Sequence, residues 1–165
     1  RTIARELARR DLPDDLDASD VIAWRDRWAE LAARGDRWIT LRVLALDTAA
    51  ALDRAAGGGG IGVPLQPTLD DRDPAYRQAA IAVVPVPVPA TMRDAIAKVV
   101  IEDTDPRVAL AAAQILCADL AVDPPKPVLA ALGPAGITRL RSLVTGPASR
   151  VVLRDLNRCL VAARK

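Results

Sequence analysis

The chain has 165 residues, of which 51% are hydrophobic, 27% charged and only 2% aromatic, and its 23 basic and 21 acidic residues nearly balance. This apolar content suits one folded domain and argues against a disordered chain. Because the sequence contains no His, it excludes Ser-His-Asp and Cys-His catalysis and lacks the commonest metal ligand, and no apolar run reaches the roughly 18 residues of a membrane span.

The first residues already carry a helical pattern. Ile3, Leu7 and the charges around them predict an amphipathic helix. Because the sequence begins at Arg1 and not at Met, we interpret it as a fragment of a longer chain or as a processed chain. The cytoplasm is the default compartment for it, with a removed signal peptide as the open alternative.

Residues 19–56 are predicted to form a hairpin of two helices. In the first helix, Trp24, Trp28 and Leu31 recur at the i, i+4, i+7 spacing of one helical face. With the charged residues between them, the two Trp residues are candidates for an aromatic and charged binding surface. The favoured interpretation is that both rings pack into the hairpin, because aromatic rings contribute a large apolar area to a helical core.

Glycine and short acidic residues mark the turns of this region. Ser19-Asp20 is expected to cap the first helix, Gly35 to close it, and Asp36 to cap the second helix. Residues 57–62 then form a Gly-rich turn. We expect this turn to be flexible, because ordering glycine costs more backbone entropy than ordering any other residue.

The most informative pattern is an internal repeat. Residues 71–84 and 103–116 align with an offset of 32 positions, and two Asp, one Pro and a pair of Ala coincide. In each copy the second Asp is the predicted N-cap, and the Pro lies at the first helical position, where an N–H is not needed. The Ala pair lets each helix approach a neighbour closely. The capping pairs are Asp73-Pro74 and Asp105-Pro106.

More helices are predicted around these two copies. They span residues 91–102, 137–144 and 150–163, the last one capped by Ser149 in a looser third copy. Alternating prolines exclude helix and central strand over residues 85–89, so we expect a stiff extended connector there. A period of roughly 30–45 residues, with one pair of helices each, is typical of an α-solenoid.

The pattern Asp-x-Asp-Pro-x-Val-x-x-x-Ala, from Asp103 to Ala112, resembles the HEAT-like repeats of bacterial proteins, including their phycocyanobilin-lyase-type relatives. The resemblance covers residues 19–163 in four irregular units and is best over 71–116. It implies an all-α fold, an α-solenoid of HEAT-like helical hairpins in a single domain over 1–165, whose concave face binds another macromolecule. It implies no catalytic residue. An irregular helical bundle is the alternative fold.

The positive charge is concentrated at the C-terminal end. The last 40 residues hold eight basic residues and one acidic residue, a net charge of +7, whereas the preceding 125 carry −5. Within this end, Arg150, Arg154 and Arg158 recur every four residues and form a predicted basic stripe along the last helix. Arg suits an acidic protein surface or a phosphate backbone, because its forked guanidinium is always charged. A polar outer face that ends a stack of repeats is the alternative interpretation.

The two cysteines, Cys117 and Cys159, lie 42 residues apart with no CxxC motif and no His partner, which argues against a zinc site. Two interpretations stay open. They are either two small buried thiols within helices, which we favour, or a disulfide between two packed helices of an exported protein.

These features predict a protein-protein interaction scaffold or regulatory module with no catalysis of its own, no cofactor and no metal site. The expected partner is another protein with an acidic surface, or a domain of the same parent chain. No binding to a membrane is expected. A nucleic-acid-binding or DNA base-repair module of the HEAT-like type is the alternative. Against it, the first 42 residues hold nine basic and nine acidic residues, which give no net attraction to DNA. The candidate partner-binding residues are Arg150, Arg154, Arg158, Trp24 and Trp28.

Overall fold

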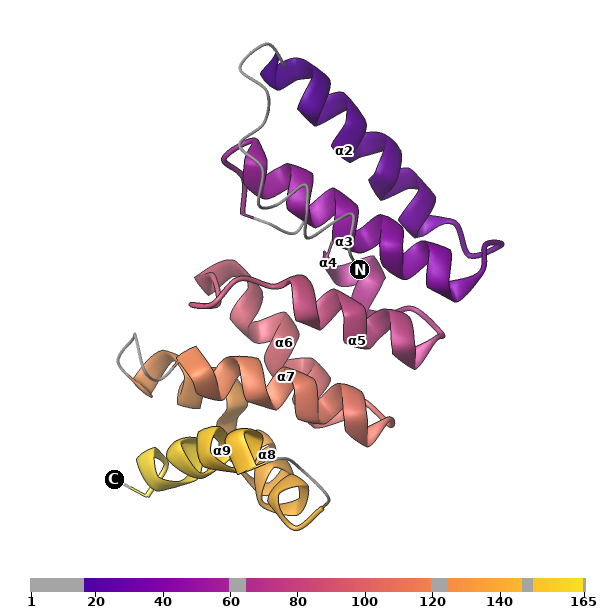
Figure 1. The fold of residues 1–165 in the computed structure, drawn as a ribbon. Helices are drawn as coiled ribbons and strands as arrows, with labels where there is room; N and C mark the ends of the chain where they lie inside the picture. Colours follow the sequence, from indigo (N-terminus) through magenta and orange to yellow (C-terminus); the bar gives the residue numbers. More distant parts are fainter. Residues whose placement is uncertain (1–16, 60–64, 120–124, 147–149, 165) are drawn as a thin grey trace. The chain divides into compact units, whose positions relative to one another are not determined.

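The computed structural model describes residues 17–59, 65–119, 125–146 and 150–164. All regular structure in these ranges is helical, with eight helices and no strand, which confirms the predicted all-α class (Figure 1). The chain divides into two compact units, Arg1–Pro85 (unit 1) and Val86–Lys165 (unit 2). None of the helices in the described ranges is long and apolar enough to cross a membrane.

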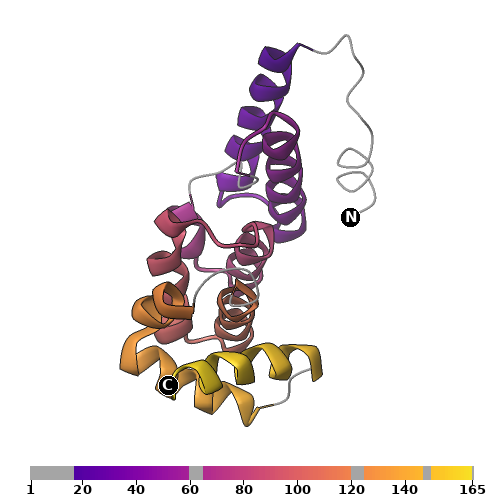
Figure 2. The same cartoon turned by 90° about the vertical axis from the view of Figure 1, so that its left-hand side faces the viewer.

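Unit 1 is built on the predicted helical hairpin. Helix α2 (Ala18–Ala33) and helix α3 (Ile39–Ala55) pack along each other and lie side by side in two views (Figure 1, Figure 2). Two shorter helices follow, α4 (Leu65–Leu69) and α5 (Pro74–Val83), and α5 packs against both α3 and α4. The core is made mainly of small side chains, which allows these helices to approach closely. Its most buried residues include Ala45, Leu46, Ala49, Ala50, Ala80 and Ile81.

The caps of the hairpin differ from the prediction. Asp17 caps α2 in place of Ser19-Asp20, and its carboxylate accepts a hydrogen bond from the amide of Ser19 at 3.2 Å. Helix α3 starts after Trp38 with no side-chain cap. Asp36, the predicted cap, pairs with Arg34 at 3.2 Å instead. Because the N-cap position of α3 is Trp38, Asp36 lies two residues before the position from which a side chain caps the helix.

Glycine closes the second helix of the hairpin and not the first. Gly57 follows α3 with φ 78°, in the left-handed region that glycine adopts at least cost. Gly35 is not in that region, and α2 ends with the amide of Arg34 bonded to the carbonyl of Leu31. Residues 60–62 of the predicted flexible turn lie outside the described residues.

The proline-rich connector coincides with the boundary between the units. Residues 84–89 contain no helix, as the alternating prolines predict. The Val86–Pro87 peptide bond is cis, and Val88 is buried.

Unit 2 contains four helices: α6 (Ala90–Glu102), α7 (Pro106–Asp119), α8 (Pro125–Val144) and α9 (Arg150–Ala162). Helix α6 packs against α7 and α8, and α9 packs against the same two helices. The helix predicted over 137–144 is the second part of α8. Its first part was not predicted and ends at Gly133, whose φ of 57° interrupts the helix.

A disulfide joins α7 to α9 inside unit 2. Cys117 and Cys159 are bonded, their Cα atoms are 5.5 Å apart, and both residues are fully buried. Of the two interpretations left open by the sequence, the favoured pair of free thiols is therefore wrong. The buried apolar residues of unit 2 come from all four of its helices. They include Ile96, Val100, Val108, Ala112, Leu116, Val128, Leu132, Leu140 and Leu156.

The internal repeat is also a repeat of structure. In each copy the first Asp accepts a hydrogen bond from the amide of the second Asp, at 2.9 Å in residues 71–75 and at 2.8 Å in residues 103–107. The second Asp then accepts from the amide two residues further on, at 2.8 Å in both copies. We call this arrangement the double-aspartate turn, and it confirms Asp73 and Asp105 as caps. Buried residues follow at the same offset: Tyr76 and Val108, Ala80 and Ala112, Ile81 and Ala113, Val84 and Leu116.

Candidate partner-binding surface

Helix α2 presents an apolar groove. Trp24, Trp28 and Leu31, together with Arg27, line a shallow cavity of about 320 Å³, which we call the α2 groove. Trp24 is 52% exposed, while Trp28 and Leu31 are half-buried. Three apolar side chains and one cation therefore face solvent on two consecutive turns of one helix.

The position of Trp24 corrects the sequence interpretation, which placed both Trp rings in the hairpin. The buried face of α2 follows Val21, Trp28 and Ala32, which lie at the i, i+7 and i+11 positions of a helix. Trp24 lies three positions after Val21 and four before Trp28, which places it at the edge of this face, and it is 52% exposed.

Exposed large apolar side chains are concentrated on the hairpin. Trp38 is 85% exposed at the start of α3, and Ile22 and Leu41 are exposed as well. Elsewhere in the described residues, Val86 and Val161 are the exposed large apolar side chains. Exposed apolar surface that is concentrated in one region is more typical of an interaction site than singly exposed residues are. The hairpin is therefore the better candidate for partner binding.

Arg27 differs from its neighbours in charge pairing. Arg25 is bonded to Asp26 at 2.7 Å and to Asp53 at 3.1 Å, and these two carboxylates raise the pKa of its guanidinium. Arg34 is likewise paired with Asp36. Arg27 forms no ion pair with any residue in the ranges that the structure describes. It therefore leaves a positive charge at the rim of the α2 groove.

The predicted basic stripe is present in part. Arg154 and Arg158 lie on the exposed side of α9, with side chains 61% and 50% exposed. Leu156 and Cys159 are buried on the other side, as predicted. The side chain of Arg150 lies outside the described residues.

The stripe is less basic than the sequence suggested. The carboxylate of Asp155, whose side chain is only 9% exposed, accepts a hydrogen bond from Arg154 at 3.3 Å and lies 3.6 Å from Arg158. One buried carboxylate therefore offsets part of the charge of both arginines. The two candidate surfaces belong to different units, with Trp24 and Trp28 in unit 1 and the arginines in unit 2.

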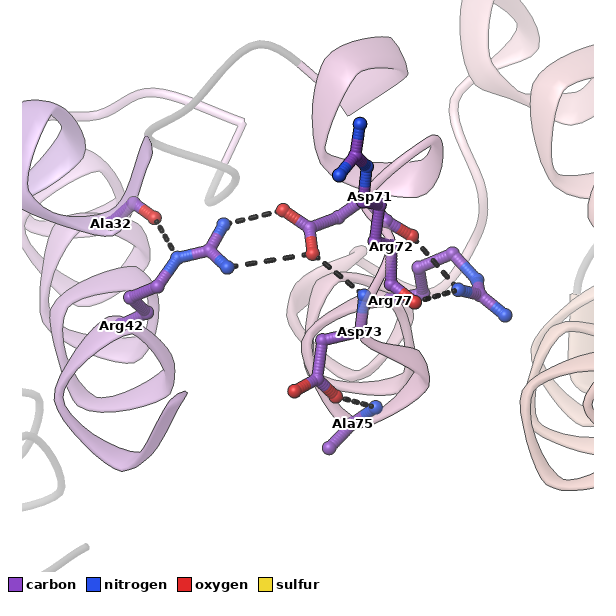
Figure 3. Close-up of polar contacts among 7 residues, drawn as sticks. All are labelled: Ala32, Arg42, Asp71, Arg72, Asp73, Ala75 and Arg77. Carbon is purple, nitrogen blue, oxygen red and sulfur yellow. Dashed lines mark hydrogen bonds and ion pairs between the residues drawn. The ribbon is translucent and has the colours of Figure 1, made fainter. Parts of the chain in front are cut away.

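A buried polar cluster of unit 1 was missed by the sequence analysis. Arg42 of α3 is only 6% exposed, and its Nε donates to the carbonyl of Ala32 at 3.0 Å (Figure 3). Its two terminal nitrogens donate to the carboxylate of Asp71, one of them at 3.4 Å. The guanidinium also lies 4.0 Å from the centre of the Tyr76 ring, a cation–π contact. We call these four residues the Arg42 clamp.

The electrostatics of the clamp fix the charges of its members. Burial alone would raise the pKa of the Asp71 carboxyl, but the hydrogen bonds from Arg42 and from the amide of Asp73 outweigh it, so that pKa is lowered. The hydrogen bond to Asp71 raises the pKa of Arg42, and burial raises the pKa of Tyr76. Because both partners stay charged, Asp71 is a poor general acid or base, and the clamp is structural.

The clamp also orders the turn that carries Asp71. Arg77 donates to the carbonyl of Asp71 at 2.8 Å and to that of Arg72 at 3.3 Å (Figure 3). A polar cavity of about 660 Å³ borders the clamp, and its charged lining consists of three Arg and three Asp. The positive and negative lining residues are equal in number. The lining charges are Arg37, Arg42, Arg72, Asp70, Asp71 and Asp73.

The described ranges contain no group of three or more His, Cys, Asp or Glu residues that could hold a metal ion. No protein-family model, no curated protein and no solved structure matches the chain. The candidate sites are therefore defined by the chain's own residues, and the α2 groove is the most developed of them.

Proposed function

We propose that this chain is a protein-interaction module built from HEAT-like helical repeats, a scaffold or regulatory part with no catalysis of its own. The observation that carries the proposal is the exposure of Trp24 and Trp38 on a hairpin that also exposes Ile22 and Leu41. Trp is among the residues most enriched at the energetic centres of protein interfaces. Modules built from repeated helical pairs characteristically offer such surfaces to other proteins.

The use of the charged residues supports a binding role over a catalytic one. The buried ion pair of Arg42 with Asp71 holds a turn, and the second aspartate of each double-aspartate turn caps a helix. The exposed cations include Arg27 beside the α2 groove and Arg154 and Arg158 on α9. They favour a protein partner with an acidic surface.

The proposal is tested by retention of partners on the immobilised chain. Proteins from an extract of cells that express the chain are compared on the wild type, on Trp24→Ser with Trp38→Ser, and on Val161→Ser, which removes an exposed apolar side chain of unit 2. We expect the wild type and the Val161 variant to retain the same proteins. The Trp variant should retain each of them in an amount at least about tenfold lower. Equal retention by all three would contradict the proposal.

A nucleic-acid-binding module is the second candidate, supported by the exposed side chains of Arg154 and Arg158. Its test is binding to duplex DNA over a range of salt concentrations, because phosphate contacts lose affinity steeply as salt rises. Steep salt dependence, together with loss of binding in Arg154→Gln with Arg158→Gln, would favour this candidate. We expect no binding even at low salt, because Asp155 offsets part of the charge.

The disulfide bears on the compartment in which the module acts. Disulfides persist in oxidising compartments and are rare in the cytosol, where thiols are kept reduced. The bond between Cys117 and Cys159 therefore supports an exported protein, in place of the cytoplasmic location that the sequence suggested. Alkylation of free thiols in the protein as isolated from its cells, before and after reduction, would distinguish the two.

A further inference from the structure

We propose that the α2 groove binds an amphipathic helix that presents a large apolar side chain and, one turn away, a carboxylate. This inference rests on the proposed function and specifies the partner. It is drawn from three properties of the groove: the spacing of its apolar residues, its shape and its single charge.

The spacing fits a helical partner. Trp24, Trp28 and Leu31 lie seven residues apart end to end, which at 1.5 Å per residue is a ridge of about 10 Å, or two helical turns. An amphipathic helix that docks into a groove uses apolar anchors at the same i, i+4, i+7 spacing. The apolar face of a helical partner therefore matches the groove over two turns. An extended strand has a different spacing, because its same-face residues lie about 7 Å apart.

The shape and lining fit one large apolar anchor. The cavity of about 320 Å³ is walled by two indole rings and a Leu side chain. Pockets that hold a ligand are lined mainly by hydrophobic and aromatic groups, with a few polar groups that fix its orientation. Here Trp24 and Trp28 supply the apolar wall, and among the described lining residues Arg27 carries the charge.

The charge fits a carboxylate. Arg27 lies three residues after Trp24 and four before Leu31, so its guanidinium is within one turn of the anchor position on either side. It forms no ion pair in the part of the chain that the structure describes. A guanidinium binds a carboxylate through two parallel hydrogen bonds, which adds direction as well as energy. Glu30 is exposed on the same helix but does not line the groove.

A second copy of the chain fits less well than an acidic helix. In a two-fold contact the same patch faces itself, so two Arg27 side chains would enter one interface. Like charges at a shared contact oppose association. The groove therefore favours a partner of the opposite charge.

The test uses two helical peptides of about 18 residues, identical except for one residue that is Glu in the first and Lys in the second. All three Trp residues of the chain, Trp24, Trp28 and Trp38, lie in this hairpin, so the intrinsic fluorescence of the full chain reports binding there. We expect the Glu peptide to bind the wild type at least about tenfold more tightly than the Lys peptide.

Variants assign the effect to named residues. Arg27→Glu is expected to reverse the preference between the two peptides, which a loss of folding would not do. Trp24→Ser should weaken both peptides at least about tenfold, while the matched control Glu30→Gln should change either affinity by less than about twofold. Equal affinity of the wild type for both peptides, or no effect of Trp24→Ser, would overturn the inference.

Other occupants of the groove would show themselves in the same experiment. A concentration-dependent dimer that Trp24→Ser abolishes, with no response to either peptide, would assign the groove to a second copy and overturn the inference. Deletion of residues 1–16 that changes the fluorescence, again with no peptide response, would assign it to the chain's own N-terminal segment. In both cases the extract experiment separately decides whether the proposed function survives.

Discussion

Both units contain the double-aspartate turn, but the interactions that hold the helices of each unit together differ. In unit 1 the first Asp of the turn, Asp71, is bound by the buried guanidinium of Arg42, which also contacts α2. In unit 2 the carbonyl of Asp103 accepts a hydrogen bond from Arg139 at 3.4 Å, and the covalent link is the disulfide between α7 and α9. The repeated motif thus specifies where a helix starts, and the contacts that close each unit come from elsewhere in the sequence.

This difference predicts that the units respond to different perturbations. An ion pair fails when either partner is removed or when its carboxylate is protonated. A disulfide is unaffected by these changes but is broken by a reductant. The Trp residues all lie in unit 1, so fluorescence follows that unit, whereas helical circular dichroism follows both.

The largest expected effect is that of Arg42→Met. The substitution removes the partner of Asp71 and leaves a carboxylate that is 18% exposed without its guanidinium. Breaking such a buried pair lowers the free energy of unfolding by about 3 kcal/mol or more. Chemical denaturation followed by Trp fluorescence measures it. Arg37→Met, an exposed arginine of the same hairpin, is the control and should cost less than about 1 kcal/mol; equal effects of the two variants would show that the clamp does not stabilise unit 1.

The next largest effect on stability is expected for Cys117→Ala with Cys159→Ala, the double substitution that removes the disulfide. The bond closes a loop across 42 residues of sequence, and we expect its removal to destabilise unit 2 by about 2–4 kcal/mol. Thermal unfolding followed by circular dichroism measures the change. A reductant should lower the stability of the wild type to a similar extent and leave the variant unchanged. If the reductant destabilises the variant as well, the effect does not come from this bond.

A smaller effect is expected at the caps. Asp73→Ala removes the acceptor for the amide of Ala75 and should cost about 1 kcal/mol, whereas Asp73→Asn keeps an acceptor and should cost little. Asp105→Ala should act in the same direction in unit 2. Denaturation curves for the pair of substitutions in each unit test whether the repeated turn has the same role twice. If the Asp→Ala substitution lowers the free energy of unfolding in one unit only, the two copies of the turn are not equivalent.

The smallest effect is the dependence on pH. Hydrogen bonds from Arg107, from its side chain and its amide, lower the pKa of Asp105 to about 2, and the pKa of Asp71 is lowered as well. A carboxyl whose pKa is lower in the folded state stabilises the fold above its ordinary pKa of about 4. This stabilisation is lost as the pH falls toward about 2, which denaturation at a series of acidic pH values would measure. A free energy of unfolding that rises as the pH falls over this range would contradict the ion pairs.

The sequence predicted the features that depend on local pattern. The helical class, the hairpin over 19–56, the caps Asp73 and Asp105 and the break at the prolines follow from periodicity and from residue types at fixed spacing. The HEAT-like resemblance and the stacking of the repeats remain predictions.

The features that the sequence did not predict depend on distant partners. Arg42 and Asp71 are 29 positions apart, and the two cysteines are 42 apart. No local spacing shows which residues meet over such a distance. The exposure of Trp24 was missed because helical periodicity gives the face on which a residue lies but not how much of that face a neighbouring helix covers.

The most direct test of this account follows unfolding by fluorescence and by circular dichroism together, with and without a reductant. We predict that the reductant lowers the midpoint of the circular dichroism transition and leaves the fluorescence midpoint of unit 1 unchanged. Arg42→Met should lower the fluorescence midpoint whether or not the reductant is present. A reductant that shifts both midpoints equally would contradict the claim that the two units are closed by independent interactions.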